Sequence, residues 1–133
     1  MNCALSDGEW KLMKLLWDSS PLTIGDMVKS LSNDTGWNKN TIFVMLGRLE
    51  AKGAVISEEG KGATGRCIRF YSPIIERGEA TLEETDNFLK RVYNGSLTML
   101  VSSLADQKKL SENDLAELRR IIDEAEEKLR AIR

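Results

Sequence analysis

With 133 residues, of which 41% are hydrophobic and 30% charged, the chain has room for one ordinary globular domain or two small ones. The lack of histidine excludes His–Cys zinc sites, Ser–His–Asp and Cys–His nucleophilic sites and imidazole general bases, so we expect no enzyme, cofactor or metal. No apolar run reaches the roughly 18 residues of a membrane span, and Cys3 and Cys67 are too few for a disulfide framework. We expect a cytoplasmic protein without membrane insertion.

Two short helices are predicted first, each preceded by a capping signal. Ser6-x-x-Glu9 is a capping box that starts the first helix, and Pro21 ends it. A second capping signal begins at Thr23 and opens the next helix, and residues 32–36 have the composition of a turn.

Residues 37–53 predict a third helix with an unusual outer face. Asn38 is a good N-cap and Gly53 follows where a C-terminal glycine cap belongs. Apolar residues recur at the i, i+3, i+4, i+7 spacing of an amphipathic helix: Ile42, Met45, Leu46 and Leu49. The opposite face carries one amide, one hydroxyl, one cation, a glycine and two apolar side chains in place of Glu and Lys: Asn40, Thr41, Phe43, Val44, Gly47 and Arg48. Such a surface indicates that another molecule binds to this face of the helix.

After the third helix the pattern changes to that of a β-hairpin. Residues 54–58 and 67–71 alternate as strands, and residues 60–65 form a glycine-rich tip without the spacing of a phosphate-binding loop. Three helices followed by a basic-tipped hairpin are the winged helix-turn-helix arrangement. The net charge of −2 argues at first against nucleic acid, but six cations cluster within 31 residues: Lys39, Arg48, Lys52, Lys61, Arg66 and Arg69.

The rest of the chain predicts three helices with a large apolar surface. The last, capped by Ser111, carries apolar residues in steps of three and four, as in a coiled coil: Leu115, Leu118, Ile122, Ala125, Leu129 and Ile132. So few residues cannot bury these faces alone, and the simplest partner is a second copy. The residues expected at this interface are Phe88, Leu89, Val92, Leu97, Leu100, Leu104, Leu115, Leu118, Ile122 and Leu129.

The predicted fold is therefore mainly α with a small β-hairpin. We expect a winged-helix DNA-binding domain over residues 1–74 and a three-helix dimerisation domain over residues 75–133.

Several motifs together resemble the penicillinase-repressor family, the BlaI/MecI/CopY group. They are Ser6-x-x-Glu9-Trp10-x-x-Met13-x-x-x-Trp17, Trp37-x-x-x-Thr41-Ile42, Leu46-x-Arg48-Leu49-x-x-Lys52-Gly53, Phe70-Tyr71-Ser72-Pro73, Phe88-Leu89-x-x-Val92-Tyr93-x-Gly95 and Leu110-Ser111-x-x-Asp114-Leu115-x-Glu117-Leu118. The resemblance covers nearly the whole chain. It implies a dimeric winged-helix repressor on a dyad operator in front of resistance or homeostasis genes.

The resemblance also implies two routes of release from DNA. Copper-responsive members carry a C-terminal cluster of cysteines, and this chain has none there, which disfavours copper sensing. Members that respond to β-lactams are cut by a membrane sensor-protease between Asn and Phe, in the short helix after the Tyr-x-Gly motif. This chain has Ser103-Leu104 at that place, which makes these two residues the candidate cleavage site. A membrane sensor-protease is accordingly a candidate partner.

The candidate DNA contacts divide into base contacts and backbone contacts. Base contacts are expected from Asn40, Thr41, Phe43 and Val44, with Asn40 paired to adenine and apolar groups against thymine methyls. Backbone contacts are expected from Asn38, Lys39, Arg48, Lys52, Lys61 and Arg66. In one alternative the helix is rotated, or Phe43 and Val44 pack under the hairpin. In another the winged helix is a protein-interaction module, where Phe43 and Val44 dock a protein and DNA is not bound.

Overall fold

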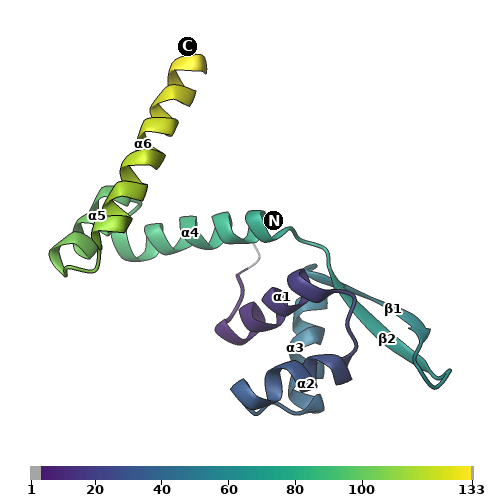
Figure 1. Cartoon of the computed structure of the whole chain (residues 1–133). Coiled ribbons are helices and arrows are strands. Elements are labelled where there is room, and N and C mark those ends of the chain that lie inside the picture. The colour runs from purple at the N-terminus through teal and green to yellow at the C-terminus, as the bar shows by residue number, and fades with distance from the viewer. Residues whose placement is uncertain (1–3, 133) are drawn as a thin grey trace. The chain divides into compact units, whose positions relative to one another are not determined.

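The computed structural model describes residues 4–132; Cys3 lies outside this range. The elements in chain order are α1 (Asp7–Ser19), α2 (Ile24–Thr35), α3 (Lys39–Ala51), β1 (Val55–Lys61), β2 (Cys67–Pro73), α4 (Arg77–Tyr93), α5 (Leu97–Asp106) and α6 (Glu112–Ile132) (Figure 1). The chain divides into two compact units, one up to Thr85 and one from Asp86 onward, so the division falls within α4.

The capping signals in the sequence form the predicted helix starts. Ser6 Oγ accepts a hydrogen bond of 3.2 Å from the Glu9 backbone N–H, and Glu9 Oε1 accepts one of 2.8 Å from the Ser6 N–H. Thr23 and Asp26 exchange the same pair of bonds, each of 3.1 Å. At α6, Ser111 and Asp114 repeat the arrangement at 3.0 Å. The three predicted N-terminal caps are confirmed.

The core of the first unit lies among α1, α2, α3 and the base of the hairpin. Side chains from all of these elements are buried in one cluster: Leu12, Met13, Leu16, Met27, Ile42, Leu46, Leu49, Ala54, Val55 and Tyr71. Trp17 and Trp37 pack against this cluster and are half-buried. Three helices followed by a two-stranded antiparallel hairpin form a winged helix-turn-helix, as the sequence predicts.

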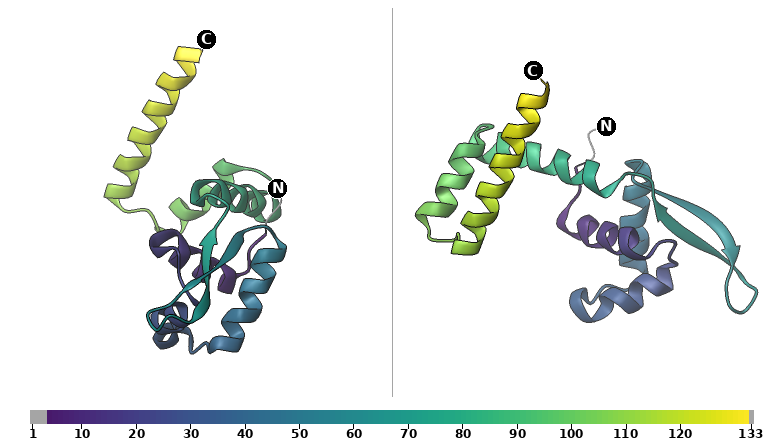
Figure 2. Two further views of the ribbon diagram at one scale, coloured as in Figure 1. Left: turned by 90° about the vertical axis from the view of Figure 1, so that its right-hand side faces the viewer. Right: turned by 45° about the horizontal axis from the view of Figure 1, so that its top comes forward.

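The hairpin extends away from the three helices, as Figure 2 shows. Its register runs from Val55 opposite Pro73 to Lys61 opposite Cys67, so each strand has seven residues where five were predicted. Gly60 pairs with Ile68 in this ladder and lies against the Phe70 ring, since a Cβ there would lie 2.7 Å from Phe70 Cε2. A short bridge between Leu22 and Tyr71 ties β2 to the α1–α2 connection.

The first residues after the hairpin remain attached to α1. Trp17 Nε1 donates a hydrogen bond of 3.0 Å to the Ile75 carbonyl, and Arg77 lies 3.5 Å from the Asp18 carboxylate. The start of α4 therefore belongs to the first compact unit. The assignment of DNA binding to residues 1–74 and of dimerisation to residues 75–133 remains a prediction.

The second unit contains the end of α4, α5 and α6. Among residues 86–132, no side chain is buried, although large apolar groups occur on each helix. Within residues 4–132 no helix is both long and apolar enough to cross a membrane.

Candidate nucleic-acid interface

Helix α3 is fixed at both ends by its own sequence. Asn38 Oδ1 accepts hydrogen bonds from the Thr41 backbone N–H at 2.9 Å and from the Thr41 hydroxyl at 3.2 Å. At the other end Gly53 has φ +77°, its N–H bonds the Glu50 carbonyl, and the Ala54 N–H bonds the Leu49 carbonyl, which is a Schellman cap. Both predicted caps are confirmed.

The inward face of α3 anchors the helix in the core and thereby fixes its outward face. Ile42, Leu46 and Leu49 are all 0% exposed. On the other side Phe43 is 60% exposed and Val44 52% exposed, so neither is a core residue. The alternative in which the helix is rotated to bury this pair does not describe the structure.

The outward face of α3 has a crest with a hollow on each flank. Asn40 lies on the crest, because it lines both hollows. Phe43 lines the hollow toward the hairpin, of about 550 Å³, and Val44 lines the opposite one, of about 450 Å³. The two apolar side chains thus face opposite flanks of one helix. A partner that straddled the crest would meet both.

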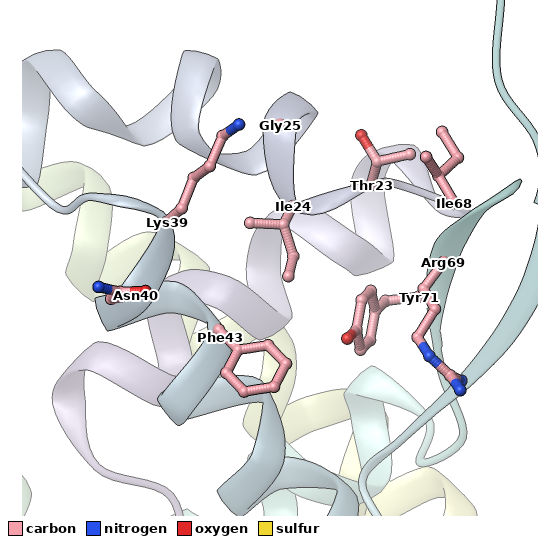
Figure 3. A pocket seen from close by; sticks show the side chains of 9 residues that line it. All are labelled: Thr23, Ile24, Gly25, Lys39, Asn40, Phe43, Ile68, Arg69 and Tyr71. Atoms are coloured by element: carbon pink, nitrogen blue, oxygen red, sulfur yellow. The ribbon is translucent and has the colours of Figure 1, made fainter. Parts of the chain in front are cut away.

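The hollow toward the hairpin has an apolar floor. Figure 3 shows the Phe43 and Tyr71 rings facing each other across it, with Ile24 beside them and the Lys39 ammonium and Arg69 guanidinium directed away from its centre. Burial raises the pKa of the Tyr71 hydroxyl above its ordinary value of 10.0, and the Glu50 charge adds to the increase. This group is therefore neutral at physiological pH.

The cations clustered between residues 39 and 69 differ in whether a carboxylate pairs with them. Within residues 4–132, Lys39, Arg48, Lys61 and Arg66 form no salt bridge. All four are exposed. Arg69 differs, because it lies 3.8 Å from Glu59 and donates a hydrogen bond of 3.0 Å to Ser57 Oγ. No carboxylate among residues 4–132 forms a salt bridge with Lys39, Arg48, Lys61 or Arg66.

Lys52, also predicted to contact DNA, joins α3 to α1. Its Nζ lies 2.6 Å from Glu9 Oε1 and donates a hydrogen bond of 2.8 Å to the Ala4 carbonyl. Glu9 is 3% exposed, and its Oε2 is buried without a hydrogen-bond partner. Burial alone would raise the pKa of this carboxyl, but Lys52 and Ser6 outweigh burial and hold the pKa below its ordinary value of 4.5. Lys52 thus has a structural partner of its own.

The sequence predicts Glu9 as a capping residue but not as the partner of Lys52. A clue was present, since Glu9 lies on the same helical face as the buried residues Leu12, Met13 and Leu16. An acidic residue on the apolar face of a helix needs a buried partner. The sequence offers no direct way to identify that partner 43 residues away.

The remaining candidate residues lie elsewhere. Cys67 is an exposed thiol at the start of β2, and residues 4–132 hold no group of three or more potential metal ligands. Ser103 and Leu104 lie inside α5, where Ser103 is half-buried and Leu104 is 38% exposed. Of the predicted dimer contacts, the large side chains most exposed are Val92, Leu97, Leu115, Ile122 and Leu129.

Comparison with known proteins places this geometry among bacterial repressors. The profile of the penicillinase repressor family matches residues 5–124. A penicillinase repressor of Bacillus licheniformis is 32% identical over 121 residues, which cover 90% of each chain. The methicillin resistance regulatory protein MecI of Staphylococcus aureus is 24% identical over 119 residues, 90% of this chain and 93% of that one. The solution structure of the DNA-binding domain of the repressor BlaI covers 59% of this chain and 90% of that chain, with 30% identity and a TM-score of 0.49.

Proposed function

The chain belongs to the penicillinase repressor family, and on that premise we propose that it is a sequence-specific transcriptional repressor that binds a dyad operator as a homodimer. The observation that carries this proposal is the outward face of α3. It presents Asn40 on the crest with Phe43 and Val44 on its two flanks. Exposed cations that form no salt bridge within residues 4–132 lie on α3 and the hairpin.

The N-terminal part of α3 would read the bases. Residues there enter the major groove most deeply in helix-turn-helix proteins. Asn40, at the crest, has an amide that can bind N6 and N7 of adenine together. Phe43 and Val44 have no polar side-chain atoms, so each can discriminate only by packing against a thymine methyl or by excluding a polar base edge. The Thr41 hydroxyl already donates to Asn38, so its methyl is the group available for such contacts.

The phosphate backbone would be held from two sides. Lys39 and Arg48 lie on α3, while Lys61 and Arg66 lie at the tip of the hairpin. Asn38 would add a hydrogen bond from its amide nitrogen, since its oxygen serves the helix cap. Lys52 contributes less in this proposal, because it holds Glu9 and the Ala4 carbonyl.

A second copy of the chain would cover the exposed apolar side chains of α4, α5 and α6. Ile122 is 54% and Leu129 62% exposed, and both lie in the a/d seam of α6. Two subunits related by a two-fold axis match the symmetry of a dyad operator. The proposed interface comprises Phe88, Leu89, Val92, Leu97, Leu100, Leu104, Leu115, Leu118, Ile122 and Leu129.

Release would follow proteolysis in α5 at Ser103-Leu104, by a membrane sensor-protease. A protease binds its substrate in an extended form, so α5 would have to unwind locally before cleavage. Because the operator is the partner, the protein would act in the bacterial cytoplasm.

A protein-interaction module is the second candidate function. The observation that favours it is the exposure of Phe43 and Val44, together with a net charge of −2. In that case the crest of α3 would dock a protein groove and no duplex would be bound.

Duplex binding at several salt concentrations separates the two functions. Two to three phosphate contacts per subunit predict a slope of log K against log[salt] of about −4 to −5 for the dimer. The measurement uses duplexes selected by the protein from a random-sequence pool and, in parallel, unselected duplex. A slope near zero, with no selection, would remove DNA binding and leave the protein-interaction module.

A further inference from the structure

Gly47 stands at an unusual place in α3. It is exposed, lies in the interior of the helix, and follows Asn40 by seven residues, so it continues the same crest. Glycine in a helix interior lowers stability relative to alanine. A Cβ added at Gly47 would meet no atom of the chain within 4 Å, so the fold does not require a glycine here.

The other glycines among residues 4–132 either contact a neighbouring side chain, adopt a backbone conformation that favours glycine, or lie in the first turn of a helix, where glycine destabilises less. Three sit beneath side chains that a Cβ would strike within 3.0 Å: Gly8, Gly60 and Gly62. Four have a left-handed backbone: Gly36, Gly53, Gly65 and Gly95. Two lie in the first turn of a helix: Gly25 and Gly78. Within residues 4–132, Gly47 is the glycine that lies in a helix interior, has no left-handed backbone and has open space where a Cβ would stand. Nothing in the described chain requires a glycine there.

We propose that Gly47 is the point at which the sugar–phosphate backbone of bound DNA approaches α3 most closely. This inference rests on the proposed function. Asn40, Phe43 and Val44 lie one to two turns earlier, in the part of the helix expected to be deepest in the groove, so the later turns cross toward the strand that borders it. Arg48, the next residue, is exposed and supplies a charge suited to a phosphate.

The chemical requirement at this point is the absence of a side chain. A methyl group at Gly47 would project about 1.5 Å from Cα into the space that the deoxyribose would fill. The contact is with the backbone and not with a base edge, so the requirement is the same for every DNA sequence. Without a side chain at position 47, the helix can approach the DNA backbone closely enough for Arg48 to contact a phosphate.

The test is Gly47→Ala in the full-length chain, measured for both stability and binding. Alanine favours the helix and meets no atom of the chain, so the melting temperature rises by about 3 °C. Affinity for the selected duplex and for unselected duplex falls together, by roughly tenfold, as expected for overpacking of a close contact. The slope of affinity against salt stays unchanged, since no charge is removed. A merely structural role for Gly47 cannot raise stability and lower affinity together.

Gly78→Ala is the matched control, because Gly78 also meets no atom within 4 Å and lies in α4. The Gly78→Ala protein should be at least as stable as the wild type and should bind duplex with unchanged affinity. Unchanged affinity in Gly47→Ala would overturn the close approach. A loss confined to the selected duplex would place a base edge there and overturn the assignment to the backbone. Failure of the wild-type chain to bind any duplex would instead remove the proposed function, before any variant is made.

Discussion

The two compact units of this chain bury their apolar side chains to very different extents. In the first, Leu12, Leu16, Met27, Ile42 and Leu46 are all 0% exposed. In the second, the apolar residues of the α6 seam are exposed except for Leu118, which is half-buried, although their spacing is as regular as that of α1 or α3. The first unit has a buried core of its own, whereas no side chain among residues 86–132 is buried.

This difference in burial shows that an amphipathic pattern predicts an apolar helix face but not the surface that packs against it. The inward faces of α1 and α3 meet each other and the hairpin. The seam of α6 meets no comparable surface within residues 86–132. Since short helices in water gain most of their stability from packing of the apolar face, the proposed dimer would stabilise the second unit by covering this face.

The largest expected effect comes from a charge in the middle of the seam. In Ile122→Glu, dimerisation would bury a carboxylate without a partner, which costs about 3–5 kcal/mol. Sedimentation equilibrium should show a monomer for the variant and a dimer for the wild type. The helical circular dichroism contributed by the second unit should decrease. The first unit should keep its fold.

Ala116→Glu provides the matched control for the seam. It adds the same charge to an exposed residue of α6 that lies off the seam, so it should leave the dimer intact. A fully dimeric Ile122→Glu protein would mean that the proposed interface is wrong.

The next largest effect concerns the first unit, whose only deeply buried carboxylate among the described residues is that of Glu9. Lys52→Met removes the cation 2.6 Å away and leaves this carboxylate buried, which should destabilise the unit by about 3 kcal/mol at neutral pH. Urea unfolding of the full-length chain measures the change. Lys29→Met, at an exposed lysine without a salt bridge among residues 4–132, is the control and should change little.

The same pair predicts a pH dependence of stability. Because the pKa of Glu9 is held below 4.5 in the folded chain, the pair contributes stability above that pH and loses it as pH falls through the folded value. In Lys52→Met, burial still raises the pKa of Glu9 and only the Ser6 hydrogen bonds oppose it, so this pKa rises relative to wild type. The stability of the variant should therefore differ less from that of wild type at pH 4 than at pH 7. An equal difference at both pH values would show that Lys52 does not stabilise the Glu9 charge.

A smaller effect should come from single phosphate contacts on α3. Arg48→Ala should weaken binding of the dimer by about 1–2 kcal/mol and reduce the salt slope by about 2, one for each subunit. The loss should be equal on selected and unselected duplex, because a phosphate contact carries no sequence information. Arg69→Ala should reduce duplex affinity less than Arg48→Ala does, because the Arg69 guanidinium already has Glu59 and Ser57 as partners. A loss restricted to the selected duplex would make Arg48 a base contact.

Local sequence signals predicted the elements well, because each cap and each apolar stripe is encoded within a few residues. The caps at Ser6, Thr23, Asn38 and Gly53 are examples. Partners distant in the chain were not predictable. The Glu9–Lys52 pair joins residues 43 apart, and the helical period alone could not decide whether Phe43 faced outward.

If the exposed side chains of α3 read DNA sequence, Phe43 should contact a thymine methyl group in the selected duplex. A double-mutant cycle tests this contact by combining Phe43→Ala with replacement of each thymine by uracil, which deletes one methyl group. At a contacted thymine we expect a coupling energy of about 1 kcal/mol, the value of one buried methyl: uracil weakens binding by the wild type and has no further effect on the variant. Zero coupling at every thymine, together with a lower melting temperature for Phe43→Ala, would contradict this expectation and make Phe43 a structural residue.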